Sequence, residues 1–359
     1  MPARTTDWND RRGELLIDAY RRLLRPALFR SYGGDPERVH EATLRWLGRI
    51  GVTPLKDVVA ALVPQARQAV EVAGVHFPGR VGLAAGLDKD GLAAPCWSAF
   101  GFGFAELGTV TAVAQPGNPA PRLFRLPRSE ALINRMGFNN HGAQALADRL
   151  GLWGVERGNQ ALGLTVGVSL GKTKATPLDE AVEDYRTSLR AVAGRADYVA
   201  LNVSSPNTPG LRQLQSGAAL TELLTALVAE APGLPLFVKL SPDLTDAELD
   251  ATLEAAARAG ASGFIATNTT LRRDGLRWPE NLLASEAGGL SGRSLARRAL
   301  AMVGRVARST ALPVIASGGV MTRDDAHALF DAGAPLVQVC TGFIYSGPGL
   351  VARINALGR

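Results

Sequence analysis

Short apolar runs rich in Val, Ile and Leu recur along the chain from residue 81 onward, and longer segments with helical periodicity separate them. The runs are almost continuously apolar, which is typical of parallel strands buried on both faces. Eight such runs are expected to form strands, at residues 81–85, 104–110, 164–170, 198–203, 236–240, 263–268, 313–317 and 336–341. Eight strands alternating with helices predict an α/β fold, a (β/α)8 TIM barrel over residues 76–359.

Two of the intervening helices have recognisable ends. Thr245 and Glu248 have the spacing of a capping box, and Gly260 ends that helix. Thr322 begins a second helix, and Gly333 ends it. Each helix lies between two predicted strands, as a barrel requires.

Residues 1–75 do not share this rhythm and are expected to form a separate N-terminal helical extension. Within it, residues 70–76 are predicted to be a small strand that caps the bottom of the barrel. Asp35 has the features of a helix cap with Pro36 at the first helical position. The apolar face expected for this helix contains Val39, Thr43, Trp46, Leu47 and Ile50.

A second apolar stripe precedes that helix and is flanked by arginines. It contains Leu16, Tyr20, Leu23, Leu24, Ala27 and Leu28. Two short amphipathic helices are therefore predicted. Two interpretations fit them equally from periodicity alone: both helices pack on the barrel, or both dock on a membrane surface.

Composition narrows the class of protein. The net charge of +6 over 359 residues suits an anionic ligand, an anionic membrane surface or nucleic acid. Because no Lys/Arg run is interleaved with aromatic residues, nucleic acid is the least favoured partner. Cys96 and Cys340 are the two cysteines and form no C-x-x-C pair, which argues against a disulfide scaffold, a zinc site or an iron–sulfur cluster. With no signal sequence or long apolar span, we expect a cytosolic or peripherally attached protein and no bound metal.

Polar residues gather where the predicted strands end. In a parallel barrel this end carries the chemistry, because all eight carboxyl ends meet on one face. The richest segment is residues 202–211, in which Pro206 and Pro209 restrict the backbone around two amides, two serines and a threonine. Gly318 and Gly319 after the seventh strand would let backbone N–H groups approach a phosphate.

Two lysines and four amides stand out among these residues. Lys239 lies inside an apolar strand, where an ammonium is costly unless an anion meets it. Lys89 lies in a loop bounded by glycines. The side chains of Asn134, Asn202, Asn207 and Asn268 offer donors and acceptors that suit a small, flat ligand, although any of them could instead stabilise a turn. The residues alone also allow a phosphate-binding isomerase or synthase barrel, or a non-catalytic membrane scaffold.

These motifs resemble those of the class 2, quinone-linked dihydroorotate dehydrogenases. The resemblance covers nearly the whole chain from about residue 26, and its most specific segments are residues 84–91, 121–126, 134–140, 202–211, 266–270 and 288–293. It implies a barrel that oxidises (S)-dihydroorotate to orotate in pyrimidine (UMP) biosynthesis and passes electrons from one FMN per chain to a membrane quinone. Ser205 matches the catalytic base of class 2, where class 1 enzymes, which use fumarate or NAD, carry Cys. A class 1-like enzyme with a soluble acceptor is the alternative.

The resemblance also implies roles for individual residues. Thr208 is the nearest candidate for a proton relay to Ser205, and His40 and Arg125 would line a quinone tunnel formed by the N-terminal helices. FMN would contact Ala84, Ala85, Gly86, Leu87, Asp88, Thr109, Ser169, Asn202, Lys239, Thr267, Gly292, Gly318, Gly319, Cys340 and Thr341. The substrate would contact Lys89, Asn134, Arg135, Met136, Gly137, Phe138, Asn202, Asn207, Asn268 and Thr269.

Two positions depart from the pattern of the family. The family usually has Asn where Ser169 stands, and Tyr beside the quinone tunnel where Cys340 stands. The partners implied are dihydroorotate or orotate, ubiquinone or menaquinone, and a lipid surface, but no nucleic acid. We expect a monomer attached peripherally to the cytoplasmic face of a bacterial-type cell membrane.

Overall fold

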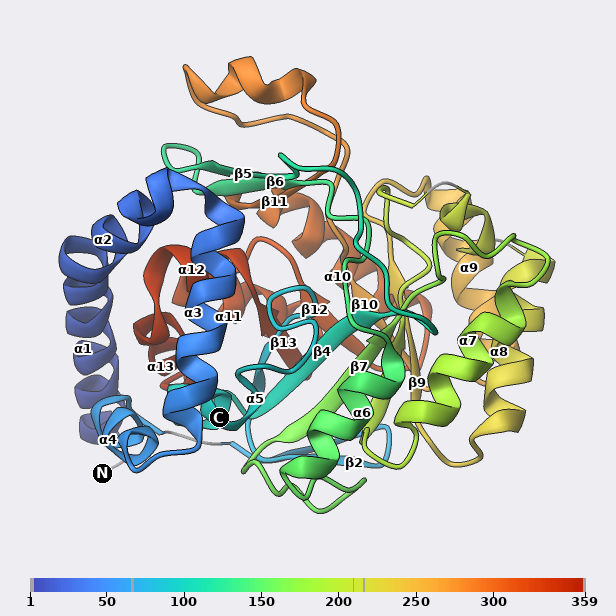
Figure 1. Ribbon diagram of the computed structural model, residues 1–359, viewed down its shortest axis with the longest axis horizontal. Coiled ribbons are helices and arrows are strands. Elements are labelled where there is room, and N and C mark those ends of the chain that lie inside the picture. The colour runs from blue at the N-terminus through green and yellow to red at the C-terminus, as the bar shows by residue number, and fades with distance from the viewer. Residues whose placement is uncertain (1–2, 66–67, 209, 216, 358–359) are drawn as a thin grey trace.

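A closed barrel of eight parallel strands forms the centre of the molecule (Figure 1). The computed structural model describes residues 3–357, apart from residues 66–67, 209 and 216, so Pro209 of the predicted motif lies outside the described residues. Around the barrel the strand order is β10-β12-β13-β3-β4-β7-β8-β9. The strands are β3 (Val81–Leu83), β4 (Phe104–Val110), β7 (Thr165–Leu170), β8 (Tyr198–Leu201), β9 (Leu236–Leu240), β10 (Gly263–Ala266), β12 (Val314–Ser317) and β13 (Leu336–Val339). The predicted α/β TIM barrel is confirmed.

Four predicted strands are too long at their carboxyl ends, where the structure ends them at residues 83, 201, 266 and 339. The next residues, Ala84, Asn202, Thr267 and Cys340, line a cavity instead of continuing the ladder. At Ala84 and Cys340 hydrophobicity gives no sign of this change, because alanine and cysteine are as apolar as the strands before them.

Helices surround the barrel and bury their apolar faces against it. The predicted capping box at Thr245 is present, and the helix that begins at Thr322 has one too, with Thr245 and Thr322 accepting the backbone N–H of the third residue of their helices. The helices are α5 (Ala94–Trp97), α6 (Ala143–Leu152), α7 (Ala181–Val192), α8 (Gly217–Glu230), α9 (Asp246–Arg258), α10 (Ala296–Ser309), α11 (Arg323–Asp331), α12 (Thr341–Ser346) and α13 (Pro348–Asn355).

A hairpin, rather than the single strand predicted over residues 70–76, closes the lower end of the barrel. Its strands are β1 (Val70–Val72) and β2 (Val75–Phe77), which pair antiparallel. A turn at Ala73 and Gly74, both at positive φ, reverses the chain between them. Side chains of the hairpin join the lower interior of the barrel in one apolar cluster: Val72, Val75, Phe77, Phe104, Tyr198, Ala200, Phe237, Ile265, Ile315 and Leu336. This cluster is the floor on which the site is built.

The N-terminal residues form helices at one side of the barrel (Figure 1). Asp35 caps α3, as predicted, by accepting the N–H groups of Glu37 and Arg38. The predicted face of α3 is wrong at Trp46, which is 59% exposed, whereas Leu44 is buried in its place. Leu23 and Leu24 of the upstream stripe are also exposed. The elements are α1 (Ala3–Ala19), the π-helical turn η1 (Tyr20–Leu24), α2 (Arg25–Arg30), α3 (Pro36–Gly51) and α4 (Leu55–Leu62).

A three-stranded antiparallel sheet lies across the upper end of the barrel (Figure 1). Its strands are β5 (Leu123–Leu126), β6 (Ala131–Asn134) and β11 (Gly289–Gly292). The sequence pattern did not predict this sheet, whose third strand comes from more than 150 residues after the second. The segment before β11, residues 271–287, projects beyond the sheet and contains the short helix η5 (Glu280–Ser285).

Candidate active site

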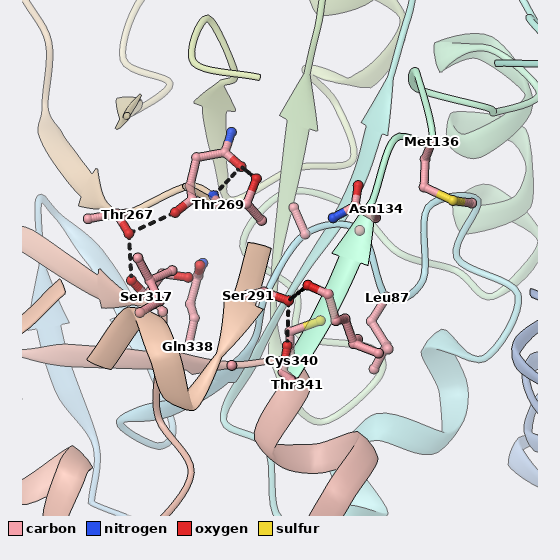
Figure 2. Close-up of a pocket in the computed structure, with 18 of the residues that line it drawn as sticks. Leu87, Asn134, Met136, Thr267, Thr269, Ser291, Ser317, Gln338, Cys340 and Thr341 are labelled. Atoms are coloured by element: carbon pink, nitrogen blue, oxygen red, sulfur yellow. Dashed lines mark hydrogen bonds between the residues drawn. The ribbon is translucent and has the colours of Figure 1, made fainter. Parts of the chain in front are cut away.

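One cavity lies at the carboxyl ends of the barrel strands and brings together most of the residues predicted for the site (Figure 2). Strand-end loops and the sheet β5-β6-β11 supply its walls. The predicted residues that line it are His40, Ala84, Ala85, Gly86, Leu87, Lys89, Thr109, Asn134, Met136, Gly137, Phe138, Asn202, Ser205, Asn207, Lys239, Thr267, Asn268, Thr269, Gly292, Gly318, Gly319, Cys340 and Thr341. Segments far apart in sequence therefore converge on one site.

Two predicted site residues turn their side chains elsewhere. The buried Asp88 carboxylate accepts hydrogen bonds from Leu92 N (2.7 Å), Ala93 N (2.9 Å) and Trp97 Nε1 (2.9 Å), so it stabilises the turn into α5 instead of facing the cavity. Burial raises the pKa of Asp88 to about 6, although these hydrogen bonds lower it. The Arg135 guanidinium pairs with Glu286 at 2.5 Å and does not line the cavity.

Ser169 and Thr208 also stand behind the cavity wall. The Ser169 hydroxyl is 2.9 Å from Thr109 Oγ1, which accepts a hydrogen bond from Asn202 Nδ2 at 2.9 Å. Ser169 itself does not line the cavity. Its hydroxyl contacts Thr109, which contacts Asn202, and both of these side chains line the cavity. The buried Thr208 hydroxyl has no hydrogen-bond partner among the described residues, and Ser205 Oγ accepts from the N–H of Asn207 at 3.2 Å. The predicted relay between Ser205 and Thr208 is not formed in this structure.

The four predicted amides form two pairs on the cavity walls. Asn207 Nδ2 donates to Asn134 Oδ1 at 3.3 Å. Asn268 Nδ2 donates to Asn202 Oδ1 at 3.0 Å and to Ser204 Oγ at 2.9 Å. Because an amide has several donors and acceptors, each pair holds its members in place and still offers polar atoms to a ligand.

The two predicted lysines differ in their partners. Lys239 Nζ forms a buried ion pair with Glu106 Oε1 at 3.1 Å, so the anion that its burial requires comes from the protein itself. Lys89 lines the cavity, and burial lowers the pKa of its ammonium. Neither a hydrogen bond nor an ion pair joins Lys89 to any other residue that the structure describes. Lys89 is thus placed to meet an anionic group of a ligand.

Cys340 lines the cavity close to both lysines. Burial raises the pKa of its thiol to about 11, and the charges of Lys239 and Lys89 oppose that rise. The protonated thiol is therefore favoured near neutral pH.

One end of the cavity is suited to a phosphate. Gly319 has a positive φ, and a Cβ there would lie 2.2 Å from the Ala296 Cα, so the backbone of the loop and the start of α10 approach one another as closely as glycine permits. The hydroxyls of Ser291 and Thr341 lie 2.9 Å apart on the same cavity (Figure 2). A deeper polar atom also lacks a partner in the described part of the chain: Gln338 Oε1 is buried and forms no hydrogen bond there. These features fit a ligand that carries both a phosphate and a polar ring.

A second, largely apolar cavity runs between the N-terminal helices and the barrel. It shares His40, Leu87, Leu123, Leu132 and Ile344 with the first cavity, so the two adjoin. Its other lining residues are Tyr20, Leu28, Phe29, Pro36, Val39, Thr43, Leu44, Leu47, Trp97, Arg125 and Phe343.

The two polar residues predicted for this tunnel are both present. Arg125 donates to the carbonyl oxygens of Phe29 and Gly34, and its guanidinium lies 4.3 Å from the Phe29 ring centre. Burial, aided by the charge of Lys89, lowers the pKa of His40 to about 3, so this side chain is neutral at physiological pH. His40 therefore lines the tunnel as an uncharged side chain.

Sequence reasoning missed Glu106, which pairs with Lys239, and Gln338, which donates to Glu106. It also missed the sheet residues Leu123, Leu132 and Ser291. A signal was available for one of them. Glu106 is a charged residue inside an apolar strand, which is the same pattern that singled out Lys239.

Comparison with known proteins gives consistent results. Residues 67–357 match the family model described as dihydroorotate dehydrogenase. A protein of Salinispora arenicola named dihydroorotate dehydrogenase (quinone) is 53% identical over 346 residues, covering 95% of this chain and 99% of that protein. A protein of the same name from Chloroflexus aurantiacus is 50% identical over 350 residues, covering 94% and 95%.

Solved structures agree with the sequence comparison. The crystal structure of DHODH from Eimeria tenella in complex with ferulenol superposes with a TM-score of 0.78 at 34% identity, covering 92% of this chain and 93% of that one. The ligand-free form from the same organism gives a TM-score of 0.79 at 36% identity, covering 89% and 93%.

Proposed function

The chain belongs to the dihydroorotate dehydrogenase family, and we propose that it oxidises (S)-dihydroorotate to orotate for pyrimidine biosynthesis and delivers the electrons to a membrane quinone. One observation carries this proposal: the polar cavity with Ser205 and Lys89 adjoins an apolar tunnel walled by the N-terminal helices. A soluble acceptor such as fumarate or NAD has no use for an apolar passage, whereas a quinone ring with its isoprenoid tail needs one.

The family is flavin-dependent, and we propose one FMN per chain as the cofactor. The glycines at 292, 318 and 319, with the Ser291 and Thr341 hydroxyls, would hold its phosphate. Lys239 and the strand-end residues Ala84, Thr109 and Asn202 would surround its ring. When bound there, the flavin supplies a two-electron acceptor for the substrate and a donor for the quinone.

The residues of the chain itself would bind and deprotonate the substrate. The Lys89 ammonium pairs with the substrate carboxylate, and Asn134 and Asn207 orient the ring. Ser205 takes the proton from C5 while the hydride leaves C6, which creates the C5–C6 double bond of orotate. Thr208 would relay that proton, because its buried hydroxyl is available for a hydrogen bond.

The N-terminal helices would dock the tunnel on a membrane. Among the described residues, ten large apolar side chains between residues 8 and 62 are exposed, against seven in the remaining chain: Trp8, Leu15, Leu23, Leu24, Tyr32, Trp46, Val52, Leu55, Val58 and Leu62. None of the described helices is long and apolar enough to cross a bilayer. We propose peripheral attachment at the cytoplasmic face, with ubiquinone or menaquinone as acceptor. Because one chain supplies all the walls of the cavity, a monomer would suffice.

Turnover with different acceptors tests the proposal. We expect the purified enzyme in detergent to oxidise dihydroorotate with a short-chain ubiquinone or menaquinone analogue, and to be inactive with fumarate and with NAD. Turnover with fumarate but with neither quinone would overturn the quinone assignment in favour of a class 1-like enzyme. A colourless protein that takes up no flavin would overturn the oxidoreductase assignment itself.

Replacement of the proposed base tests the chemical step. Ser205→Ala is expected to keep its flavin, because Ser205 is not assigned to cofactor binding, but to reduce it far more slowly with dihydroorotate in a stopped-flow experiment. An unchanged rate of flavin reduction would remove Ser205 from the mechanism.

A further inference from the structure

A carboxylate lies directly below the proposed flavin site, inside the barrel. Glu106 of β4 is fully buried and accepts three hydrogen bonds: from Lys239 Nζ at 3.1 Å, from Gln338 Nε2 at 2.6 Å and from Tyr198 OH at 3.3 Å. Lys239 and Gln338 line the cavity, whereas Glu106 and Tyr198 lie beneath it. The four side chains come from four different strands and form one network.

A glycine on the neighbouring strand leaves the space that this network occupies. Gly167 is the register partner of Glu106 on the neighbouring strand, and a Cβ on Gly167 would lie 2.1 Å from the Tyr198 ring. The missing side chain lets Tyr198 reach across to the carboxylate. A buried carboxylate is costly unless it is paired and hydrogen-bonded, and here three donors from separate strands converge on it.

We propose that Glu106 is a positioning residue that fixes the Lys239 ammonium beneath the flavin and offsets part of its positive charge. This inference rests on the proposed function, because it assigns the electrostatics of the same cofactor site. With side-chain exposures of 6% and 0%, Lys239 and Glu106 are shielded from water, so each acts strongly on its neighbours. The pair, rather than Lys239 alone, then sets how readily the bound flavin accepts electrons.

The charge of Glu106 can be removed while its hydrogen bonds to Lys239 and Gln338 are kept. Gln338 donates to Glu106 through Nε2, while its Oε1 is buried and meets no partner among the residues that the structure describes. In Glu106→Gln, a rotation of the Gln338 carboxamide would present Oε1 to the new amide N–H. The variant therefore preserves volume and one hydrogen bond between the two side chains while it deletes one negative charge.

A double-mutant cycle tests this assignment on flavin-loaded enzyme purified in detergent. The variants are Glu106→Gln, Lys239→Met and the two combined, and the readouts are the midpoint potential of the flavin and its dissociation constant for sulfite, which binds more tightly when positive charge lies near the ring. Glu106→Gln should raise the potential and tighten sulfite binding by roughly tenfold, the effect of one charge-assisted hydrogen bond. Lys239→Met should lower the midpoint potential and weaken sulfite binding. In the double variant, Glu106→Gln should shift both readouts less than it does on its own, because Glu106 acts partly by holding Lys239 in place.

Two results would overturn the inference: an unchanged potential in Glu106→Gln, or an equal shift from Glu106→Gln in the presence and absence of Lys239. If Glu106→Gln does not retain flavin, Glu106→Asp serves instead. It keeps the charge but draws it back from Lys239 by one methylene, so a smaller shift in the same direction is expected, and no shift would refute the role. Failure of the proposed function would show earlier, as a wild-type protein that holds no flavin.

Discussion

Trp46 offers a direct test of membrane docking. It follows Thr43 by three residues and Val39 by seven on α3, so it lies at the edge of the helix face that lines the apolar tunnel. At 59% exposure, a side chain of up to about 250 Å² presents roughly 150 Å² to solvent. Transfer of that area from water at about 25 cal/mol per Å² contributes at most about 4 kcal/mol. If half of the area inserts, Trp46→Ala should weaken vesicle binding by about 2 kcal/mol, or roughly thirtyfold.

The chain provides a matched control. Trp278 is 72% exposed, but it lies in the projecting segment 271–287, far in sequence from the N-terminal helices. Sedimentation with vesicles of phosphatidylethanolamine and phosphatidylglycerol would compare Trp46→Ala with Trp278→Ala. We expect the first to lose binding and the second to keep it, while both retain flavin and its rate of reduction by dihydroorotate. Equal loss in the two variants, or none in Trp46→Ala, would refute the argument that α3 faces the membrane.

Three further predictions concern stability and ligand binding. Gly167→Ala should destabilise the fold by about 2 kcal/mol or more, because its Cβ would overlap the Tyr198 ring, whereas Gly194→Ala, with open space around it, should be near neutral in urea unfolding. His40 has a pKa of about 3 when folded and about 6.5 when unfolded, so it contributes stability above pH 6.5 that is lost as the pH falls. By pH 5 that loss is at most about 2 kcal/mol, and the urea midpoint of His40→Gln should vary less between pH 7.5 and 5 than that of the wild type; an identical pH dependence would contradict this. Lys89→Met should weaken orotate binding, followed by flavin absorbance, by at least about thirtyfold, and unaltered affinity would remove Lys89 from the substrate site.

The strands of the barrel were predictable because a strand buried on both faces leaves a continuous apolar run, and such runs leave little ambiguity about which residues are inside. The carboxyl ends of the strands could not be predicted in the same way. Ala84 and Cys340 are apolar, yet they lie beyond the last paired residue of their strands and line the cavity. The face of α3 was misassigned at Trp46 for a related reason. Periodicity identifies apolar residues, but it does not distinguish those that contact the barrel from those left exposed.

The cavity residues at the strand ends could be predicted from the sequence, but those in the additional sheet and in the barrel interior could not. Residues such as Asn202 and Thr267 could be placed because barrel topology brings all strand ends together. The contribution of the sheet β5-β6-β11 depends on residues 131–134 meeting residues 289–292, a pairing that no local pattern encodes. For Glu106, in contrast, the residue itself has a recognisable local pattern. Its pattern was visible, but the identity of its partner, Lys239, follows from the geometry of the barrel interior.

The N-terminal helices and the substrate site are physically connected, which bears on how the two half-reactions are joined. Glu37 of α3 receives Arg122 Nη2 at 2.7 Å in a mostly buried ion pair. The same guanidinium donates to the carbonyl oxygen of Asn118 at 2.7 Å, and Asn118 Nδ2 donates to the carbonyl oxygen of Asn207 at 3.4 Å. Three contacts thus lead from the helix that walls the tunnel to Asn207, whose side chain lines the cavity. A displacement of α3 would pull on these contacts, and we expect it to shift the loop that is proposed to orient the substrate, which would couple the extension to the barrel.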